Sequence, residues 1–240
     1  MNIFFKKKKT KKTIVIVNSS NITGKLIYNE YKNLNKNLIL LDKNPIKLEK
    51  TIKKEKKTSI YNIDNNLENI SILKQLILNK YKKIDAIIFN NIEVFNATPI
   101  EKTSIKELTK NINNNIIDTI YLLKEMMILL KKSKNSSIIF TLFTKKIVNK
   151  AYMLYNSISY SSILSIIKTI KEEYSNHKNI KINIVDIYEP TINKIYSYIK
   201  QGDINKEKIF IECISKIIEK KFKNKIITTE NNKIITKKIN

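Results

Sequence analysis

The sequence predicts an α/β fold built on a doubly wound parallel sheet of about seven strands, with helices on both faces. Short apolar runs alternate with longer helical patterns along the chain of 240 residues, as in successive strand–helix–strand units. Most of these runs are continuously apolar rather than alternating, which is typical of strands covered on both faces. No repeat or break in composition divides the chain. We therefore expect a single domain over residues 13–240, preceded by a basic tail at residues 1–12.

The expected strands are seven short runs rich in branched apolar residues. They are TIVIV (13–17), NLILL (37–41), TSIYNI (58–63), IDAIIFN (84–90), SSIIFTLF (136–143), IKINIV (180–185) and KIITT (225–229). The patterns between them predict helices. These cover Gly24 to Asn35, Pro45 to Lys56, Leu67 to Lys82, Ser104 to Lys132, Ala151 to Ser175 and Asn205 to Phe222.

The composition is strongly biased toward lysine. All 46 basic residues are Lys, and the chain has no Trp, two Gly and three Pro. The scarce residue types have GC-rich codons, so a mutational bias toward A and T explains the composition more simply than selection for a basic surface. The net charge of +25 leaves nucleic-acid binding as a remote alternative. The spread of Lys along the whole chain and the absence of Arg, which suits bidentate phosphate contacts, argue against it.

Cys213 is the only cysteine, so no internal disulfide can form and a reducing compartment is expected. Its helical spacing with Ile209 and Ile214 predicts a buried position. The only histidine, His177, has no Cys or second His beside it, which predicts a loop residue rather than a metal ligand. No run reaches the length of a membrane span, and the apolar segment at the N-terminus is too short for a signal peptide. We expect a cytoplasmic protein that does not bind a membrane.

Polar residues follow the strands at the edge where doubly wound sheets bind their ligands. NSSNITGK (18–25) follows the first strand, Asp42 follows the second, and Asn90 ends the fourth. Gly24 fits a ligand-binding turn and equally an ordinary strand-to-helix turn capped by Ser or Asn. Asp42 can accept hydrogen bonds from the hydroxyls of an adenosine ribose, or it can cap the next helix.

The first of these segments resembles the cofactor turn of the short-chain dehydrogenase/reductase superfamily. VNSSNITG (17–24) is similar to the TGxxxGxG motif, with Asn18, Ile22 and Gly24 at the three glycine positions. The resemblance extends from Lys12 to about Lys233 and implies a Rossmann-like domain that uses NAD or NADP. NKYKKIDAIIFNN and LLKKSKNSSIIFT are also similar to a bacterial subgroup, the YciK-like oxidoreductases.

The resemblance implies roles for later residues as well. Asp42 stands where NAD-preferring members carry an acid, so NAD is favoured, and Asp64 matches the acid that contacts adenine. FNNIE (89–93) is similar to the NNAG motif, with Asn90 as its first Asn. NNIIDTI (114–120) is similar to the segment that carries a structural and proton-relay Asn, here Asn115.

Other positions depart from the family pattern and imply weak or lost cofactor binding. Asn18 tolerates left-handed backbone geometry, but Ile22 places a branched side chain where backbone approaches the pyrophosphate. Ser20, with Ser19 and Thr23, can donate a hydroxyl to phosphate near the helix N-terminus. The bulky pair Ile187-Tyr188 replaces the family's Pro-Gly.

The catalytic pair is also altered. In the family a Tyr gives a proton to the substrate carbonyl, and a Lys four residues later lowers the pKa of that Tyr. Here these positions are Tyr155 and Ser159. Positions i and i+4 share one helical face, and a cation about 4 Å away contributes roughly 4 kcal/mol to ionising a phenol whose pKa is about 10. The family's Ser falls on Leu142, with Thr141 and Thr144 the nearest hydroxyls.

Two functional interpretations remain. Residue chemistry favours a degenerate member of the superfamily that keeps the fold without efficient catalysis. The alternative is a working oxidoreductase for a small carbonyl or alcohol, whose atypical site uses Tyr155 and Asn115 with another Lys, such as Lys145 or Lys146. The segment from Thr191 to Asp203 carries no recognisable pocket pattern, so the substrate stays open.

The resemblance implies a homodimer through the helices from Ser104 to Lys132 and from Ala151 to Ser175. The first helix carries an apolar stripe at three- and four-residue spacing, made of Ile105, Leu108, Ile112, Ile116, Ile120, Leu123, Met127 and Leu130, and Leu122, Met126 and Leu129 extend it to a second face. A helix apolar on more than one face needs a cover beyond its own sheet. That cover is either a second copy of the chain or neighbouring helices of the same chain.

Overall fold

The computed structural model describes residues 11–52, 55, 57–63, 67–90, 96–143, 148–187, 204–219, 222, 224–230 and 233–239. Several predicted features lie outside the described residues. They are most of the basic tail, Asp64, Asn91, Thr144, Lys145, Lys146, Tyr188 and the segment from Thr191 to Asp203.

Eight strands form one sheet in the order β3-β2-β1-β4-β5-β6-β7-β8. They are β1 (Thr13–Val17), β2 (Asn37–Asp42), β3 (Thr58–Asn62), β4 (Ala86–Asn90), β5 (Ser136–Phe143), β6 (Ile180–Ile187), β7 (Lys225–Glu230) and β8 (Lys233–Lys238). Strands β1 to β7 pair in parallel, and β8 pairs antiparallel with β7. All seven expected strands are present, which confirms the predicted doubly wound sheet.

The eighth strand corrects the expected number of seven. β8 has the sequence KIITKK and lies at the edge of the sheet. Edge strands commonly carry Lys, which discourages pairing with another chain. Because an edge strand needs no continuous apolar run, the pattern that identifies central strands did not find it.

The described helices are α1 (Ile22–Tyr31), α2 (Pro45–Thr51), α3 (Leu67–Tyr81), α4 (Ile105–Ile112), α5 (Asp118–Lys131), α6 (Leu154–Glu173) and α8 (Ile204–Ile218), with a short 3-10 turn at Ile100–Lys102. The helix predicted from Ser104 to Lys132 is divided, because Asn113–Ile117 form a π-helical turn between α4 and α5. Such turns insert an extra residue into a helix and often occur at functional sites. Helix α1 ends before the predicted Asn35, since the residues from 33 to 35 are exposed and bury no face. Helix α2 likewise ends short of the predicted Lys56.

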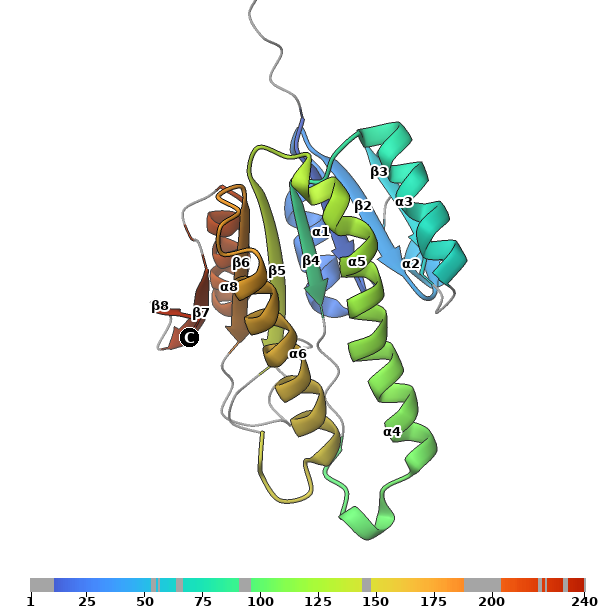
Figure 1. The fold of residues 1–240 in the computed structure, drawn as a ribbon, viewed down its shortest axis with the longest axis vertical. Helices are drawn as coiled ribbons and strands as arrows, with labels where there is room; N and C mark the ends of the chain where they lie inside the picture. The colour runs from blue at the N-terminus through green and yellow to red at the C-terminus, as the bar shows by residue number, and fades with distance from the viewer. Residues whose placement is uncertain are drawn as a thin grey trace, which may run out of the picture.

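The two faces of the sheet carry separate helix layers (Figure 1). Helices α3, α5 and α6 bury their apolar residues on one face, and α1, α2 and α8 bury theirs on the other. In β1, Val15 and Val17 belong to the first cluster, while Ile14 and Ile16 belong to the second. Both faces of this strand are therefore buried, as its continuous apolar run predicts.

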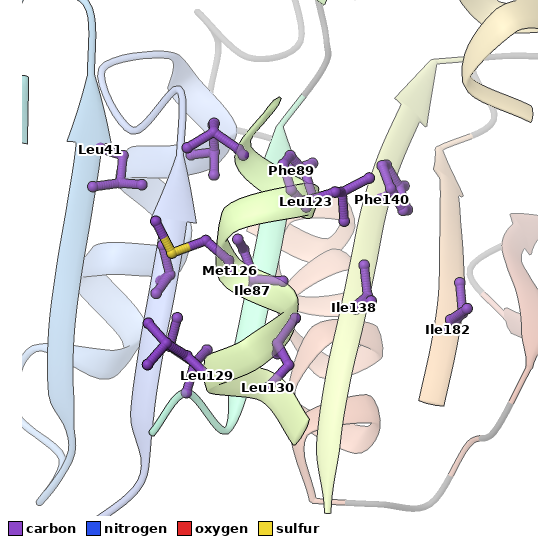
Figure 2. Packing of buried hydrophobic residues seen from close by; sticks show 14 of the residues in the cluster. Leu41, Ile87, Phe89, Leu123, Met126, Leu129, Leu130, Ile138, Phe140 and Ile182 are labelled. Atoms are coloured by element: carbon purple, nitrogen blue, oxygen red, sulfur yellow. The ribbon is translucent and has the colours of Figure 1, made fainter. Parts of the chain in front are cut away.

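Helix α5 packs along the central strands (Figure 2). Its residues Leu123, Met126, Leu129 and Leu130 share one cluster with Ile87, Phe89, Ile138 and Phe140 of β4 and β5. The rings of Phe89 and Phe140 stack with centroids 5.0 Å apart. Full burial of each such side chain contributes about 1.5–3 kcal/mol. This layer fixes α5, and with it the π-helical turn, against the sheet.

The remaining sequence predictions about single residues concern Cys213 and His177. Cys213 is fully buried in α8, as predicted, and burial raises the pKa of its thiol to about 12. His177 is exposed before β6, which confirms a loop residue, and its ring lies 5.2 Å from that of Tyr174. Among the described helices, none has the length and apolar character needed to cross a membrane.

Candidate functional site

The turn after β1 leads directly into α1 at the carboxyl edge of the sheet. Asn18 has a φ of 52°, which lies in the left-handed region that Asn tolerates better than most residues. Asn21 is the N-cap of α1, and its Oδ1 accepts a 2.7 Å hydrogen bond from the backbone N–H of Gly24. The expected Ser or Asn cap is therefore Asn21. Ile22, at the second glycine position, is the first residue of α1.

Gly24 lies where α1 passes closest to this turn. A Cβ atom at position 24 would lie 2.7 Å from Cα of Ser19, 2.8 Å from the carbonyl oxygen of Ser19 and 2.9 Å from that of Asn18. These are backbone atoms that cannot rotate away, so only glycine fits. The third glycine of dinucleotide-binding turns has this same role, since it lets the helix pack closely.

Two of the three hydroxyl groups expected to bind phosphate form hydrogen bonds inside the protein. The Oγ of Ser19 is buried and donates to the carbonyl oxygen of Leu41 at 3.1 Å. The Oγ1 of Thr23 donates to Oδ1 of Asn21 at 3.0 Å. Ser20 has a half-buried side chain, so it is the hydroxyl of this turn best placed to meet an external ligand.

Asp42 ends β2 and faces the same turn. Its Oδ2 accepts a 2.6 Å hydrogen bond from the backbone N–H of Ser20, and its Oδ1 accepts a 3.0 Å hydrogen bond from that of Asn44. The N-cap of α2 is Asn44 rather than Asp42, and Asp42 holds the backbone of that cap residue. Each carboxylate oxygen has a second lone pair, which leaves acceptor capacity for a ribose hydroxyl.

Asn90 joins the ends of three neighbouring strands. Its side-chain amide donates to the carbonyl oxygen of Val17 at 3.0 Å, and its Oδ1 accepts from the hydroxyl of Thr141 at 3.2 Å. Its backbone carbonyl oxygen accepts from the side-chain amides of Asn18 and Asn21. Asn90 therefore holds the turn and the strand ends together. The buried Thr141 hydroxyl belongs to this network, which argues against it as a replacement for the family's catalytic Ser.

The residues at the catalytic positions lie beside the π-helical turn. Figure 1 shows α4 and the first part of α6 beyond the carboxyl ends of the central strands, where the two helices contact each other. Asn115 lies within the π-helical turn, and its backbone carbonyl oxygen accepts from the hydroxyl of Thr119 at 2.7 Å. The side chain of Asn115 is buried.

Tyr155 and Ser159 both form hydrogen bonds toward α4. The hydroxyl of Tyr155, a residue only 4% exposed, donates to the carbonyl oxygen of Ser104 at 3.1 Å. The hydroxyl of Ser159 donates to Oδ1 of Asn111 at 2.6 Å. Leu142, at the position of the family's Ser, is buried in β5. The two positions of the Tyr-Lys pair thus contribute to helix packing.

A second cluster of polar side chains, which the sequence did not predict, joins the residue after β2 to the π-helical turn and the start of α5. The Nζ of Lys43 lies 2.6 Å from Oδ2 of Asp118 and 2.6 Å from Oδ1 of Asn114. Burial raises the pKa of the Asp118 carboxyl above its ordinary value, and the hydrogen bond from Lys43 offsets part of that rise. Within the part of the chain that the structure describes, no three His, Cys, Asp or Glu side chains come together as a metal site.

The strand order, the glycine turn that opens α1 and the acid that ends β2 define the Rossmann-like class of dinucleotide-binding domains. A family model described as short chain dehydrogenase matches residues 12–190. The chain therefore belongs to the short-chain dehydrogenase family. Among curated proteins, no sequence match was found.

Solved structures share the fold at low sequence identity. A short-chain dehydrogenase from Streptomyces avermitilis has a TM-score of 0.75 at 13% identity, covering 92% of this chain and 89% of that chain. The YciK oxidoreductase from E. coli has a TM-score of 0.66 at 19% identity, covering 73% and 74%. A metagenomic short-chain oxidoreductase in complex with NADP has a TM-score of 0.65 at 15% identity, covering 81% and 91%. At these identities the likeness shows the fold alone.

Proposed function

We propose that this protein binds NAD or NADP and has only weak oxidoreductase activity toward a carbonyl or alcohol. Its family supports the class of reaction. The hydrogen bonding of Tyr155 supports weak activity, because the Tyr155 hydroxyl donates to the carbonyl oxygen of Ser104. One helical turn on, position 159 carries Ser where the family has Lys.

The turn after β1 fits a dinucleotide. Gly24 allows α1 to pack closely, and the N-terminus of α1 carries the positive end of a helix dipole, which attracts phosphate. A bound nicotinamide dinucleotide would supply the hydride. The internal hydrogen bonds of Ser19 and Thr23, together with Ile22 at the second glycine position, favour weak binding. The NADP in the metagenomic relative supports the nucleotide class.

Proton transfer is the step that this chain supports poorly. Ser159 provides no positive charge beside the Tyr155 phenol, and its own hydroxyl donates to Asn111. Tyr155 therefore lacks the neighbouring charge that activates this residue in the family, and its proton is already donated inside the protein.

The π-helical turn favours a second candidate, a working enzyme with an atypical site. Such turns are frequent at functional sites, and this one contains Asn115, the relay position. In this candidate Tyr155 and Asn115 act with a Lys from elsewhere, such as Lys145 or Lys146. The substrate would be a small carbonyl or alcohol, with NAD favoured by Asp42.

A homodimer is the assembly that this proposal includes. On the α4–α5 side, Leu122, Leu123, Met126, Leu129 and Leu130 are buried on the sheet. Ile105, Ile117, Ile120 and Ile128 are instead exposed, by 71%, 36%, 42% and 54%. The sheet covers one face of the helix, so we assign the exposed isoleucines to contact with a second copy.

The first experiment is a fluorescence titration of the protein with NADH and with NADPH. Saturable binding of either nucleotide is expected. No binding up to millimolar nucleotide would contradict both candidates, because each requires a dinucleotide.

The second experiment compares turnover on a panel of ketones and aldehydes. We expect very low turnover in the wild type and a rise in Ser159→Lys, which restores the charge beside Tyr155. Ser161→Lys, at an exposed position of the same helix, is the matched control and should leave turnover unchanged. Ordinary wild-type turnover that disappears in Tyr155→Phe would establish the second candidate instead.

A further inference from the structure

We propose that Asp118 strengthens the preference for NAD over NADP, because it holds Lys43 in an ion pair and so keeps the charge of Lys43 from a 2′-phosphate. This inference rests on the proposed dinucleotide function and assigns part of its specificity to a residue outside the cofactor turn.

Lys43 is the cationic side chain nearest in sequence to the expected ribose position. It directly follows Asp42, the acid at the end of β2, and in doubly wound domains the acid at this point contacts the 2′-hydroxyl of the adenosine ribose. A neighbouring basic residue is what accommodates a 2′-phosphate. A Lys43 side chain that was not held by Asp118 would therefore support NADP binding and oppose the effect of Asp42.

In the structure the charge of Lys43 is balanced. Its ammonium group lies 2.6 Å from Oδ2 of Asp118 and also donates to Oδ1 of Asn114. The Lys43 side chain is 35% exposed, whereas that of Asp118 is 11% exposed. These two hydrogen bonds hold the ammonium group against α5 and the π-helical turn.

Asp118 is also poorly able to release Lys43. Its other carboxylate oxygen, Oδ1, is buried and has no hydrogen-bond partner among the described residues. If Lys43 turned toward a ligand, a nearly buried carboxylate would remain without its counter-charge, which is strongly unfavourable. The cost of that separation opposes binding of a 2′-phosphate by Lys43.

The test measures dissociation constants of NADH and NADPH by fluorescence titration of the full chain. Wild type should bind NADH more tightly. Asp118→Asn removes the counter-charge, so the affinity for NADPH should rise about fivefold, the scale of one charge interaction near the surface. The affinity for NADH should change less than about twofold, because NADH has no 2′-phosphate.

Two further variants identify the source of the gain in NADPH affinity. The double variant Lys43→Met, Asp118→Asn should lose this gain, since the charge of Lys43 is absent. Glu125→Gln breaks a comparable ion pair with Lys74 farther along α5 and should leave both affinities unchanged. An unchanged NADPH/NADH ratio in Asp118→Asn, or a gain that persists in the double variant, would overturn the inference.

The outcome also separates this inference from the proposed function. Absence of NADH binding in the wild type would refute the proposed function and this inference together, whereas intact NADH binding with an unchanged ratio would refute this inference alone. If Asp118→Asn does not fold, the ratio of NADPH to NADH affinity in Lys43→Met tests the inference instead. A Lys43 already held by Asp118 predicts little change in the ratio, and a loss of NADPH affinity greater than about threefold would show that Lys43 already binds the phosphate.

Discussion

The hydroxyl of Tyr155 donates a 3.1 Å hydrogen bond to the carbonyl oxygen of Ser104, the residue that caps α4. Four residues later, Ser159 bonds to Asn111 of the same helix. The helical face that the family uses for proton transfer here joins α6 to α4. This relationship predicts a structural role for the Tyr155 hydroxyl.

Tyr155→Phe should lower the free energy of unfolding by about 1 kcal/mol, because it removes the hydrogen bond from the Tyr155 hydroxyl to the carbonyl oxygen of Ser104. Urea unfolding measures the change. Tyr152→Phe is the matched control, since Tyr152 is 60% exposed, and it should have no effect. Equal stability of Tyr155→Phe and wild type would contradict a structural role for the hydroxyl.

Gly24→Ala should destabilise the protein by about 1–3 kcal/mol through overpacking, because the added Cβ would meet backbone atoms. The nearest is Cα of Ser19 at 2.7 Å. The shift of the turn should also weaken binding of NADH in the titration described above. Lys25→Ala, at the next position of α1, is the control and should preserve both stability and binding. A Gly24→Ala variant as stable as wild type would show that α1 can move away from the turn.

Asp85→Asn should destabilise the protein in a pH-dependent way. Oδ1 of Asp85 accepts hydrogen bonds from Lys83 at 2.7 Å and from Ser133 at 2.6 Å, and Oδ2 accepts from the backbone N–H of Thr13 at 2.9 Å. Burial raises the pKa of this carboxyl, but the hydrogen bonds outweigh it, so the pKa lies below the ordinary value of 3.8. Its contribution to stability is therefore complete above the unfolded pKa and is lost as the pH falls through the folded pKa.

At pH 7 the loss in Asp85→Asn should be about 1.5–3 kcal/mol, as for hydrogen bonds to a charged group. Below about pH 4 the difference from wild type should shrink, because the unfolded chain takes up the proton first and the native carboxylate follows at lower pH. Urea unfolding across this range measures it, with the exposed Glu173 changed to Gln as the control. A difference independent of pH would mean that the charge of Asp85 contributes nothing.

The proposed homodimer should strengthen with salt. The net charge of +25 opposes association, and screening reduces that repulsion. Sedimentation at low and moderate ionic strength measures the effect. Ile120→Glu should give a monomer, while Ile46→Glu, at a position 67% exposed on the other face of the sheet, should not. A wild-type monomer at micromolar concentration under both conditions would rule the dimer out.

The sequence by itself determined the sheet and the positions around its carboxyl edge. Continuous apolar runs identified the central strands because both of their faces are buried. Asn18 and Gly24 were recognised because the backbone geometry of a tight turn restricts the residue types that fit there. The family resemblance pairs Tyr155 with Ser159, two positions that share a helical face. All of these are local properties of the chain.

Only the tertiary structure decided which polar groups meet. Lys43 and Asp118 are separated by 75 positions, and Tyr155 and Ser104 by 51. The π-helical turn at Asn113–Ile117 interrupts a helix whose apolar spacing predicts no break. β8 is the edge strand, and its own Lys-rich sequence does not show the continuous apolar run of the central strands. Contacts of this kind depend on how whole layers pack, since a hydrogen bond between distant segments forms only after the sheet and helices have fixed both partners in space.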